Sequence, residues 1–119
     1  MTTYSCKDGA EKLRAAIEAF LACDPAIRLE CLLVFLSVCE NEGLSIKDLV
    51  YACGLGESMV SRAVDTLCNP AQSGLLETAR HPTDGRRRLV FLASNGKTLA
   101  KKITDILTER GAIETTATG

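Results

Sequence analysis

The stretch LSIKDLVYACGLGESMVSRAVDTL, residues 44–67, predicts two short helices separated by a tight turn. Ser45, followed three residues later by Asp48, forms a capping-box pattern that opens the first of these helices. Residues 54–56, Gly-Leu-Gly, provide the turn. The second helix begins at Glu57, and its inward-facing apolar residues are Val60, Val64 and Leu67. A short helix, a three-residue turn and a second helix form the layout of a helix-turn-helix.

Two further helices are predicted upstream of this stretch. The first should end near Asp24, because the residue before a proline is driven out of the helical region. The second is followed by Asn-Glu-Gly at residues 41–43, and its wide apolar face predicts a central, largely buried element. The residues expected to face the core recur at helical spacing: Leu13, Ala16, Ile17, Phe20 and Leu21 in the first helix, and Leu29, Leu32, Leu33, Leu36 and Cys39 in the second.

A β-hairpin and a last helix are predicted downstream. Residues 75–80 form one strand and residues 88–92 the return strand, because the turn-forming residues 82–85 lie between them. A helix follows from Ser94, with Leu99, Ile103, Ile106 and Leu107 as its apolar residues. The Thr-rich tail after Arg110 is expected to be frayed. The predicted fold class is mainly α with a small β-hairpin, a winged helix-turn-helix.

The composition narrows the class of protein. A chain of 119 residues corresponds to one domain, and 46% apolar with 24% charged residues argues against disorder. Aromatic residues make up only 4%, which argues against a base-stacking platform for single strands or RNA. The longest apolar run, residues 31–38, is too short to span a bilayer. Residues 1–20 lack the apolar segment of a secretory signal, so the expected compartment is the cytoplasm.

The charges are distributed unevenly, although the net charge is only −1. Residues 1–60 carry five basic and nine acidic side chains, whereas residues 61–119 carry nine and six. Four arginines and one aspartate lie between Arg80 and Arg88. The sequence therefore predicts a local basic patch on an otherwise acidic protein.

The six cysteines do not form a recognisable framework. They are Cys6, Cys23, Cys31, Cys39, Cys53 and Cys68. No Cys-x-x-Cys occurs and a single histidine is present, so no zinc site is predicted. Without a secretory signal, disulfides are not expected either, and buried thiols acting as small apolar residues are the simplest interpretation. A redox or metal sensor is the alternative, with Cys6 and Cys23 as the first candidates.

The second helix of a helix-turn-helix enters the major groove and presents its N-terminal half to the base edges. Here its outward positions hold Ser58, Ser61 and Arg62, together with Glu57 and Asp65. Arg62 can pair with a guanine edge or a phosphate, and the serines can donate to either. Ser58 suits a phosphate because the helix N-terminus supplies further donors. The alternative is a plain helical hairpin with solvated polar residues, which the two acidic residues favour.

The arginines at and beside the hairpin tip are the second candidate DNA contact. Arg80, Arg86, Arg87 and Arg88 can follow the DNA backbone or enter a narrow minor groove, whose negative potential attracts them. Asp84 lies two residues before Arg86, close enough to orient its guanidinium. The alternative is a solvated turn whose charges keep an edge strand from aggregating.

In combination, these segments resemble the winged helix-turn-helix of the MarR family of bacterial regulators. The resemblance covers about residues 27–107 and rests on the strings LSIKDLVYACGLGESMVSRAVDTL, GLLE and DGRRRLVFLASNGKTL. The matching positions are Val60-Ser61-Arg62 in the recognition helix, Gly74-Leu75 at the start of the first strand, Asp84 and Arg86 in the wing, and Leu92 with Gly96 at the start of the last helix.

The resemblance implies a sequence-specific regulator of transcription that binds double-stranded DNA as a homodimer, most commonly as a repressor. It implies a DNA-binding core over residues 26–93, with dimerisation helices over residues 1–25 and 94–119. Three departures stand out: the loop over residues 68–73 is longer, Ala93 replaces the usual Thr so that Ser94 or Asn95 must cap the last helix, and only about one flanking helix remains on each side. A small-molecule effector is therefore left open.

An enzyme is not predicted, because the chain has one histidine, no paired carboxylates on a shared face, no glycine-rich phosphate loop and no nucleophile motif. His81 is interpreted as a phosphate contact or a bystander, and no cofactor or metal is expected. Two alternatives remain. One is a winged helix that binds proteins instead of DNA, and the other is the same DNA-binding fold switched by cysteine oxidation.

Overall fold

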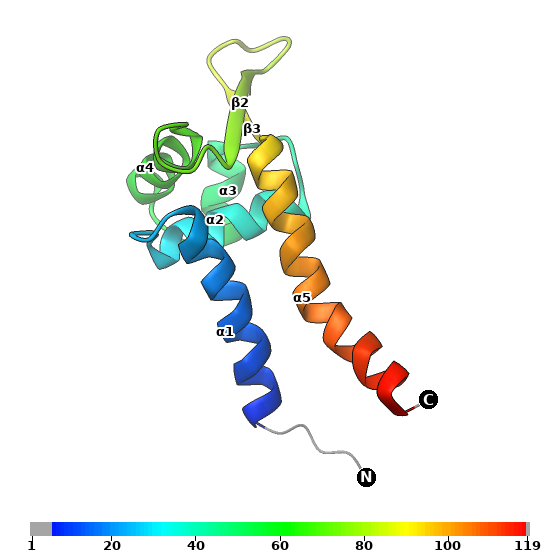
Figure 1. Cartoon of the computed structure of the whole chain (residues 1–119). Coiled ribbons are helices and arrows are strands. Elements are labelled where there is room, and N and C mark those ends of the chain that lie inside the picture. The colour runs from blue at the N-terminus through cyan, green and yellow to red at the C-terminus, as the bar shows by residue number, and fades with distance from the viewer. Residues whose placement is uncertain (1–5, 119) are drawn as a thin grey trace.

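The computed structural model describes the backbone of residues 6–118 and the side chains of residues 6–108. Five helices and three short strands follow one another in this part of the chain (Figure 1). In order they are α1 (Cys6–Cys23), α2 (Leu29–Glu40), β1 (Leu44–Ser45), α3 (Ile46–Cys53), α4 (Glu57–Cys68), β2 (Leu76–Arg80), β3 (Arg88–Leu92) and α5 (Ser94–Thr118). The predicted winged helix-turn-helix is confirmed.

α2 lies at the centre of the body, as the sequence predicts, because α3, α4 and β3 all pack against it. Its buried residues are Cys31, Val34, Phe35 and Val38. Phe35 meets Phe20 of α1 edge-on, with the ring centroids 5.5 Å apart. This aromatic contact ties α1 to the helical body.

The core faces predicted for α1 and α2 are partly wrong. Leu29, Leu33 and Leu36 of α2 are 73%, 47% and 39% exposed, and the buried face is the opposite one. α2 is apolar almost all round, so its periodicity does not distinguish the two faces. Leu13 and Leu21 of α1 are also exposed. The buried residues of α1 are the predicted Ala16 and Phe20, together with Ala19.

The local signals of the helix-turn-helix are confirmed. The Ser45 hydroxyl accepts the backbone N–H of Asp48 at 3.1 Å, and the Ser45 N–H donates to the Asp48 carboxylate at 3.2 Å. α3 ends at Cys53 and is capped by Gly54, whose φ of 70° lies in the left-handed region that favours glycine. α4 then buries its predicted apolar residues, Val60, Val64 and Leu67, and also Ala63.

The predicted hairpin is present, but it belongs to a three-stranded antiparallel sheet. β2 pairs with β3 from Leu76 opposite Leu92 to Arg80 opposite Arg88. β1, which the sequence analysis does not predict, pairs with the other edge of β3, with Leu44 opposite Val90. A two-residue strand has no periodicity of its own, so only the partner strand defines it.

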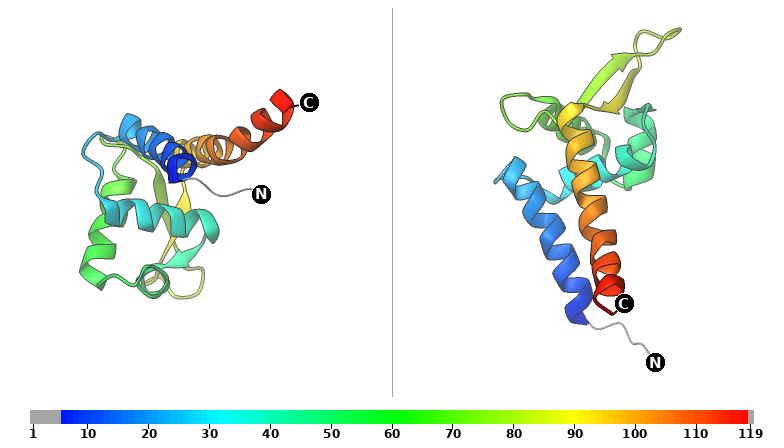
Figure 2. Two further views of the ribbon diagram at one scale, coloured as in Figure 1. Left: turned by 90° about the horizontal axis from the view of Figure 1, so that it is seen from below. Right: turned by 45° about the vertical axis from the view of Figure 1, so that its right-hand side comes forward.

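α1 and α5 pack against each other and extend from the body on the side opposite the hairpin (Figures 1 and 2). The backbone of α5 is helical through Thr118, beyond Arg110, where fraying is expected from the sequence. Asn95, one of the two capping candidates, donates its side-chain amide to the Ser73 carbonyl at 3.2 Å. It therefore joins the start of α5 to the loop between α4 and β2.

Candidate nucleic-acid interface

The exposed face of α4 carries the side chains predicted to read DNA. Ser58 and Arg62 are exposed and Ser61 is half-buried. The residue before the helix, Gly56, makes no side-chain cap, so the first N–H groups of α4 have no side-chain acceptor from that position. Ser58 thus lies beside free backbone donors at the positive end of the helix dipole, an arrangement suited to an anion.

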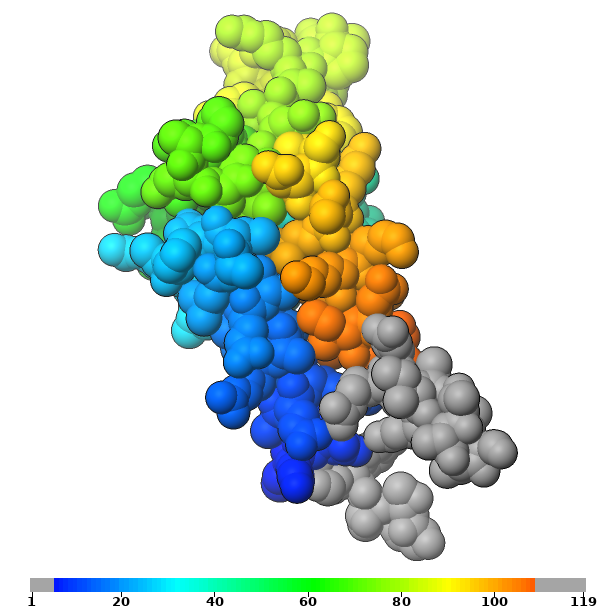
Figure 3. Space-filling view, viewed as in Figure 1, coloured from blue at the N-terminus to red at the C-terminus, as the bar shows by residue number. Residues whose placement is uncertain are grey.

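The hairpin forms a wing that rises from the body next to α4 (Figures 1 and 3). Arg86, whose side chain is 94% exposed, pairs with Asp84 at 3.7 Å, and its backbone N–H donates to the same carboxylate at 3.2 Å. The proximity of Asp84 to Arg86 predicted from the sequence is confirmed. Arg80 donates to the Gly85 carbonyl at 3.2 Å, which braces the tip. His81 accepts backbone N–H groups inside the turn through Nδ1.

A shallow groove lies between the wing and the helix-turn-helix. It is lined by Ile46, Lys47, Glu57, Ser61, Arg86, Arg87 and Arg88. Four cationic side chains and one acidic side chain therefore face this groove, which gives it a positive potential. Lys47, in the first turn of α3, was missed by the sequence analysis, because α3 carries no local signal for which of its exposed residues faces the wing.

The structure separates the other predicted residues from this groove. Arg62 lines a second hollow of about 460 Å³, on the flank of α4 away from the wing. Arg80 lines a further hollow on the wing, together with Thr78, Arg86 and Arg88. The candidate interface is therefore a surface that extends from α4 across the groove to the wing, rather than one pocket.

The three consecutive arginines have three different surroundings. Arg86 pairs with Asp84 within the wing. Arg87 donates to the Ser45 hydroxyl at 3.5 Å and so lies against the start of α3. Arg88 pairs with Asp65 of α4 at 3.2 Å. Their side chains do not form a uniform basic tip, although the sequence presents them as one run.

Solved structures with this arrangement of elements include DNA-binding regulators. RV1404 from Mycobacterium tuberculosis is similar with a TM-score of 0.72 and 18% identity, covering 95% of this chain and 82% of that one. MepR from S. aureus, solved as a complex with DNA, is similar with a TM-score of 0.69 and 21% identity, covering 94% of this chain and 86% of that one. A MarR transcriptional regulator from Methanosarcina mazei is similar with a TM-score of 0.63 and 21% identity, covering 92% of this chain and 73% of that one. The chain has the MarR-type winged-helix fold.

No protein-family profile matches the chain, and no curated protein does either. Within the MarR-type fold, α3 and α4 are the helix-turn-helix, and the hairpin of β2 and β3 is the wing. Ser58, Ser61 and Arg62 therefore lie on the second helix of the helix-turn-helix, and the four arginines Arg80, Arg86, Arg87 and Arg88 lie on the wing.

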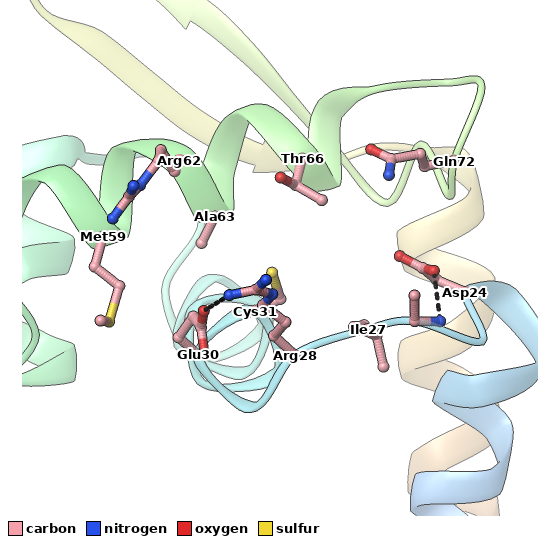
Figure 4. A pocket seen from close by; sticks show the side chains of 11 residues that line it. Asp24, Ile27, Arg28, Glu30, Cys31, Met59, Arg62, Ala63, Thr66 and Gln72 are labelled. Atoms are coloured by element: carbon pink, nitrogen blue, oxygen red, sulfur yellow. Dashed lines mark hydrogen bonds and ion pairs between the residues drawn. The ribbon is translucent and has the colours of Figure 1, made fainter.

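The hollow beside Arg62 lies between α4 and the connection from α1 to α2 (Figure 4). Met59 and Arg62 stand at one end, and Asp24 and Gln72 at the other. Asp24 accepts the Ala26 N–H at 3.0 Å, so one of its carboxylate oxygens holds the connecting loop. The lining is mainly polar or charged, unlike an apolar pocket for an aromatic ligand.

The cysteines show little sign of activated thiols. Burial raises the pKa of Cys31 and Cys68, and burial with the nearby Glu42 and Glu40 raises the pKa of Cys39 to about 11. A raised pKa lowers the fraction of reactive thiolate. Cys6 is exposed and Cys23 half-buried. Among the described residues, no group of three potential metal ligands occurs, and no helix is long and apolar enough to cross a membrane.

Proposed function

We propose that this protein is a cytoplasmic regulator of transcription that binds double-stranded DNA in a sequence-specific manner. The observation that carries this proposal is the cationic groove, which adjoins the exposed, polar face of α4 in a MarR-type fold. The DNA complex of MepR, a structure with the same fold, supports it.

In the proposed complex, α4 enters the major groove. Ser58, Ser61 and Arg62 contact base edges and the adjacent phosphates, because they occupy the exposed side of the helix. Arg86, oriented by Asp84, reaches the flanking minor groove or backbone from the wing. Arg80 and Arg87 are further wing contacts predicted from the sequence, and Lys47 joins them as a phosphate contact. Arg88, predicted from the sequence with them, pairs with Asp65 of α4.

We further propose that the protein acts as a homodimer through α1 and α5, over residues 1–25 and 94–119. Leu13, Leu21 and Leu107 are each more than 40% exposed on these helices, and a second copy would cover them. A two-fold axis would place the two α4 helices about 34 Å apart, one turn of DNA, and the site would be pseudo-palindromic. Leu13→Glu should then yield monomers in analytical ultracentrifugation, and a monomeric wild type at micromolar concentration contradicts this part.

Selection of bound duplexes from a random-sequence library, followed by titration at several salt concentrations, tests DNA binding. We expect one enriched motif and a linear fall of log K with log salt, since phosphate contacts release counterions. The absence of any enriched motif, with no binding at low salt by correctly folded protein, would remove the proposal. Repression is tested separately, by placing the selected motif over a reporter promoter.

The division of labour between helix and wing has its own test. Arg62→Ala should reduce discrimination between the selected motif and unrelated DNA, with a cost of about 1–3 kcal/mol on the motif. Arg86→Ala should weaken binding to every sequence similarly and lower the salt slope by about 0.9 per lost phosphate contact. Equal losses on all duplexes for both variants contradict the assignment.

A protein-binding winged helix is the second candidate function. The observation that favours it is the outer face of α2, where Leu29, Leu33 and Leu36 are exposed together. If the selection experiment finds no DNA binding, the protein-binding function remains as the candidate. The thiol-switch alternative rests on Cys6 and Cys23, of which Cys6 is exposed and Cys23 half-buried. The raised pKa values of Cys31, Cys39 and Cys68 make these three thiols poorer candidates for such a switch.

A further inference from the structure

One ion pair connects the wing to α4. Arg88, the first residue of β3, donates from Nη2 to Oδ1 of Asp65 at 3.2 Å. Asp65 lies one turn beyond Ser61, on the wing side of α4, and 23 residues separate it from its partner in the chain. The pair therefore joins the two elements that would have to contact the duplex together.

Arg88 is also placed differently from its neighbours. Its side chain is 42% exposed, compared with 94% for Arg86, and its Nε is buried without a hydrogen-bond partner in the described part of the chain. The guanidinium thus contacts α4 with one edge, while the pair with Asp65 remains partly exposed to solvent. Arg80 stands directly opposite Arg88 across the hairpin. Like charges in such a pair repel, and the Asp65 carboxylate offsets that repulsion.

We propose that Arg88 is a positioning residue, not a DNA contact: it holds the wing against α4 and neutralises Asp65. This inference rests on the proposed DNA-binding function. Without its partner, the Asp65 carboxylate would face phosphates at close range and repel them. The acidic residue on the recognition helix is then compatible with DNA binding only because the wing supplies a cation to it.

A double variant distinguishes the two possible roles of Arg88, a phosphate contact or a partner of Asp65, because the two roles predict different DNA affinities and salt dependences. If Arg88 held a phosphate, its removal would lower the number of counterions released, whatever residue occupied position 65. If Arg88 only pairs with Asp65, removal of the Arg88 and Asp65 charges together leaves the contacts between protein and phosphates intact. Asp65→Asn with Arg88→Ala keeps the local net charge of the pair at zero, so it separates the two cases.

The first experiment measures binding of the selected duplex and of a random-sequence duplex at several salt concentrations. Arg88→Ala should bind roughly fivefold more weakly, the effect of one repulsive surface charge at contact distance. The double variant should recover affinity and keep the wild-type salt slope. Arg86→Ala is the control, and its slope should fall by about 0.9. A slope in the double variant that falls as in Arg86→Ala overturns the proposal.

The second experiment needs no DNA, so it separates this inference from the proposed function. In the free protein, the His81 and Arg87 N–H groups are held within the wing by bonds to the Arg87 and Asp84 carbonyls. Amide exchange at both positions should rise by a similar factor in Arg88→Ala and in Asp65→Ala, because each variant removes one member of the same hydrogen-bonded pair. Unchanged exchange in both, or a rise in only one, overturns the positioning role. Circular dichroism checks that the variants remain folded.

Discussion

Gly96, in the first turn of α5, provides a direct test of how α5 is seated on the body. A Cβ added here would overlap the carbonyl oxygen of Leu75, and it would lie 3.1 Å from the carbonyl carbon and 3.3 Å from Cε1 of Phe35. The Leu75 carbonyl is held in place, because its oxygen accepts the Ala93 N–H at 2.9 Å. Gly96→Ala must therefore push α5 away from the body.

Two opposing effects set the size of the change. Within a helix, alanine is favoured over glycine by roughly 0.5–1 kcal/mol. Overpacking a tight contact costs about 1–3 kcal/mol, and the upper end applies here because a backbone carbonyl cannot rotate away as a side chain can. We expect Gly96→Ala to lower the free energy of unfolding by about 2 kcal/mol, which corresponds to a fall in Tm on the order of 8–10 °C.

Urea unfolding followed by circular dichroism measures this change, at one protein concentration because dimerisation contributes to stability. Gly9→Ala is the matched control: Gly9 is also helical, but a Cβ there meets nothing within 4 Å. It should be neutral or stabilising by about 0.5 kcal/mol. If Gly96→Ala keeps the wild-type midpoint, or gains stability as Gly9→Ala does, the packing of α5 against Leu75 is wrong.

Three further predictions concern single side chains. Ser45→Ala should lower the free energy of unfolding by about 1 kcal/mol, since it removes the cap of α3, and a wild-type urea midpoint contradicts this. Hydrogen bonds with the backbone N–H and the side chain of Ser45 lower the pKa of Asp48 in the folded protein. The ionised Asp48 carboxylate therefore stabilises the fold above the ordinary Asp pKa of about 3.9, and this stabilisation is lost as the pH falls through the lower folded pKa. Asp48→Asn should therefore be less stable than wild type at neutral pH, with the difference shrinking in acid; a constant difference down to about pH 2 argues against the cap. A thiol reagent at about pH 8 should modify exposed Cys6 first and Cys39 much later, as followed by mass spectrometry, because the Cys39 pKa of about 11 leaves little thiolate.

The elements that have strong local signals were predictable. The Ser45–Asp48 cap, the glycine turn that ends α3 and the turn chemistry of the wing each act over a few residues, so they are visible in any short window of sequence. The same holds for the proximity of Asp84 and Arg86, which are two residues apart. These signals located most of the candidate interface.

The features that depend on distant segments were not predictable. β1 exists only through its pairing with β3, and the leucines of α2 face outward because α4 covers the other side of an evenly apolar helix. Lys47 joined the candidate site because the wing lies across the start of α3. In each case the deciding contact is with a segment that a local pattern does not contain.

The run Arg86-Arg87-Arg88 shows the boundary between the two kinds of information. The sequence by itself determined that a basic wing follows a helix-turn-helix, because turn residues, strand periodicity and helix caps are local properties. Only the tertiary structure decided that Arg86 stays in the wing tip, that Arg87 turns to Ser45 and that Arg88 turns to Asp65. Identical side chains acquire different surroundings here because the packing of α3 and α4 against α2 brings Ser45 and Asp65 to different positions beside the wing.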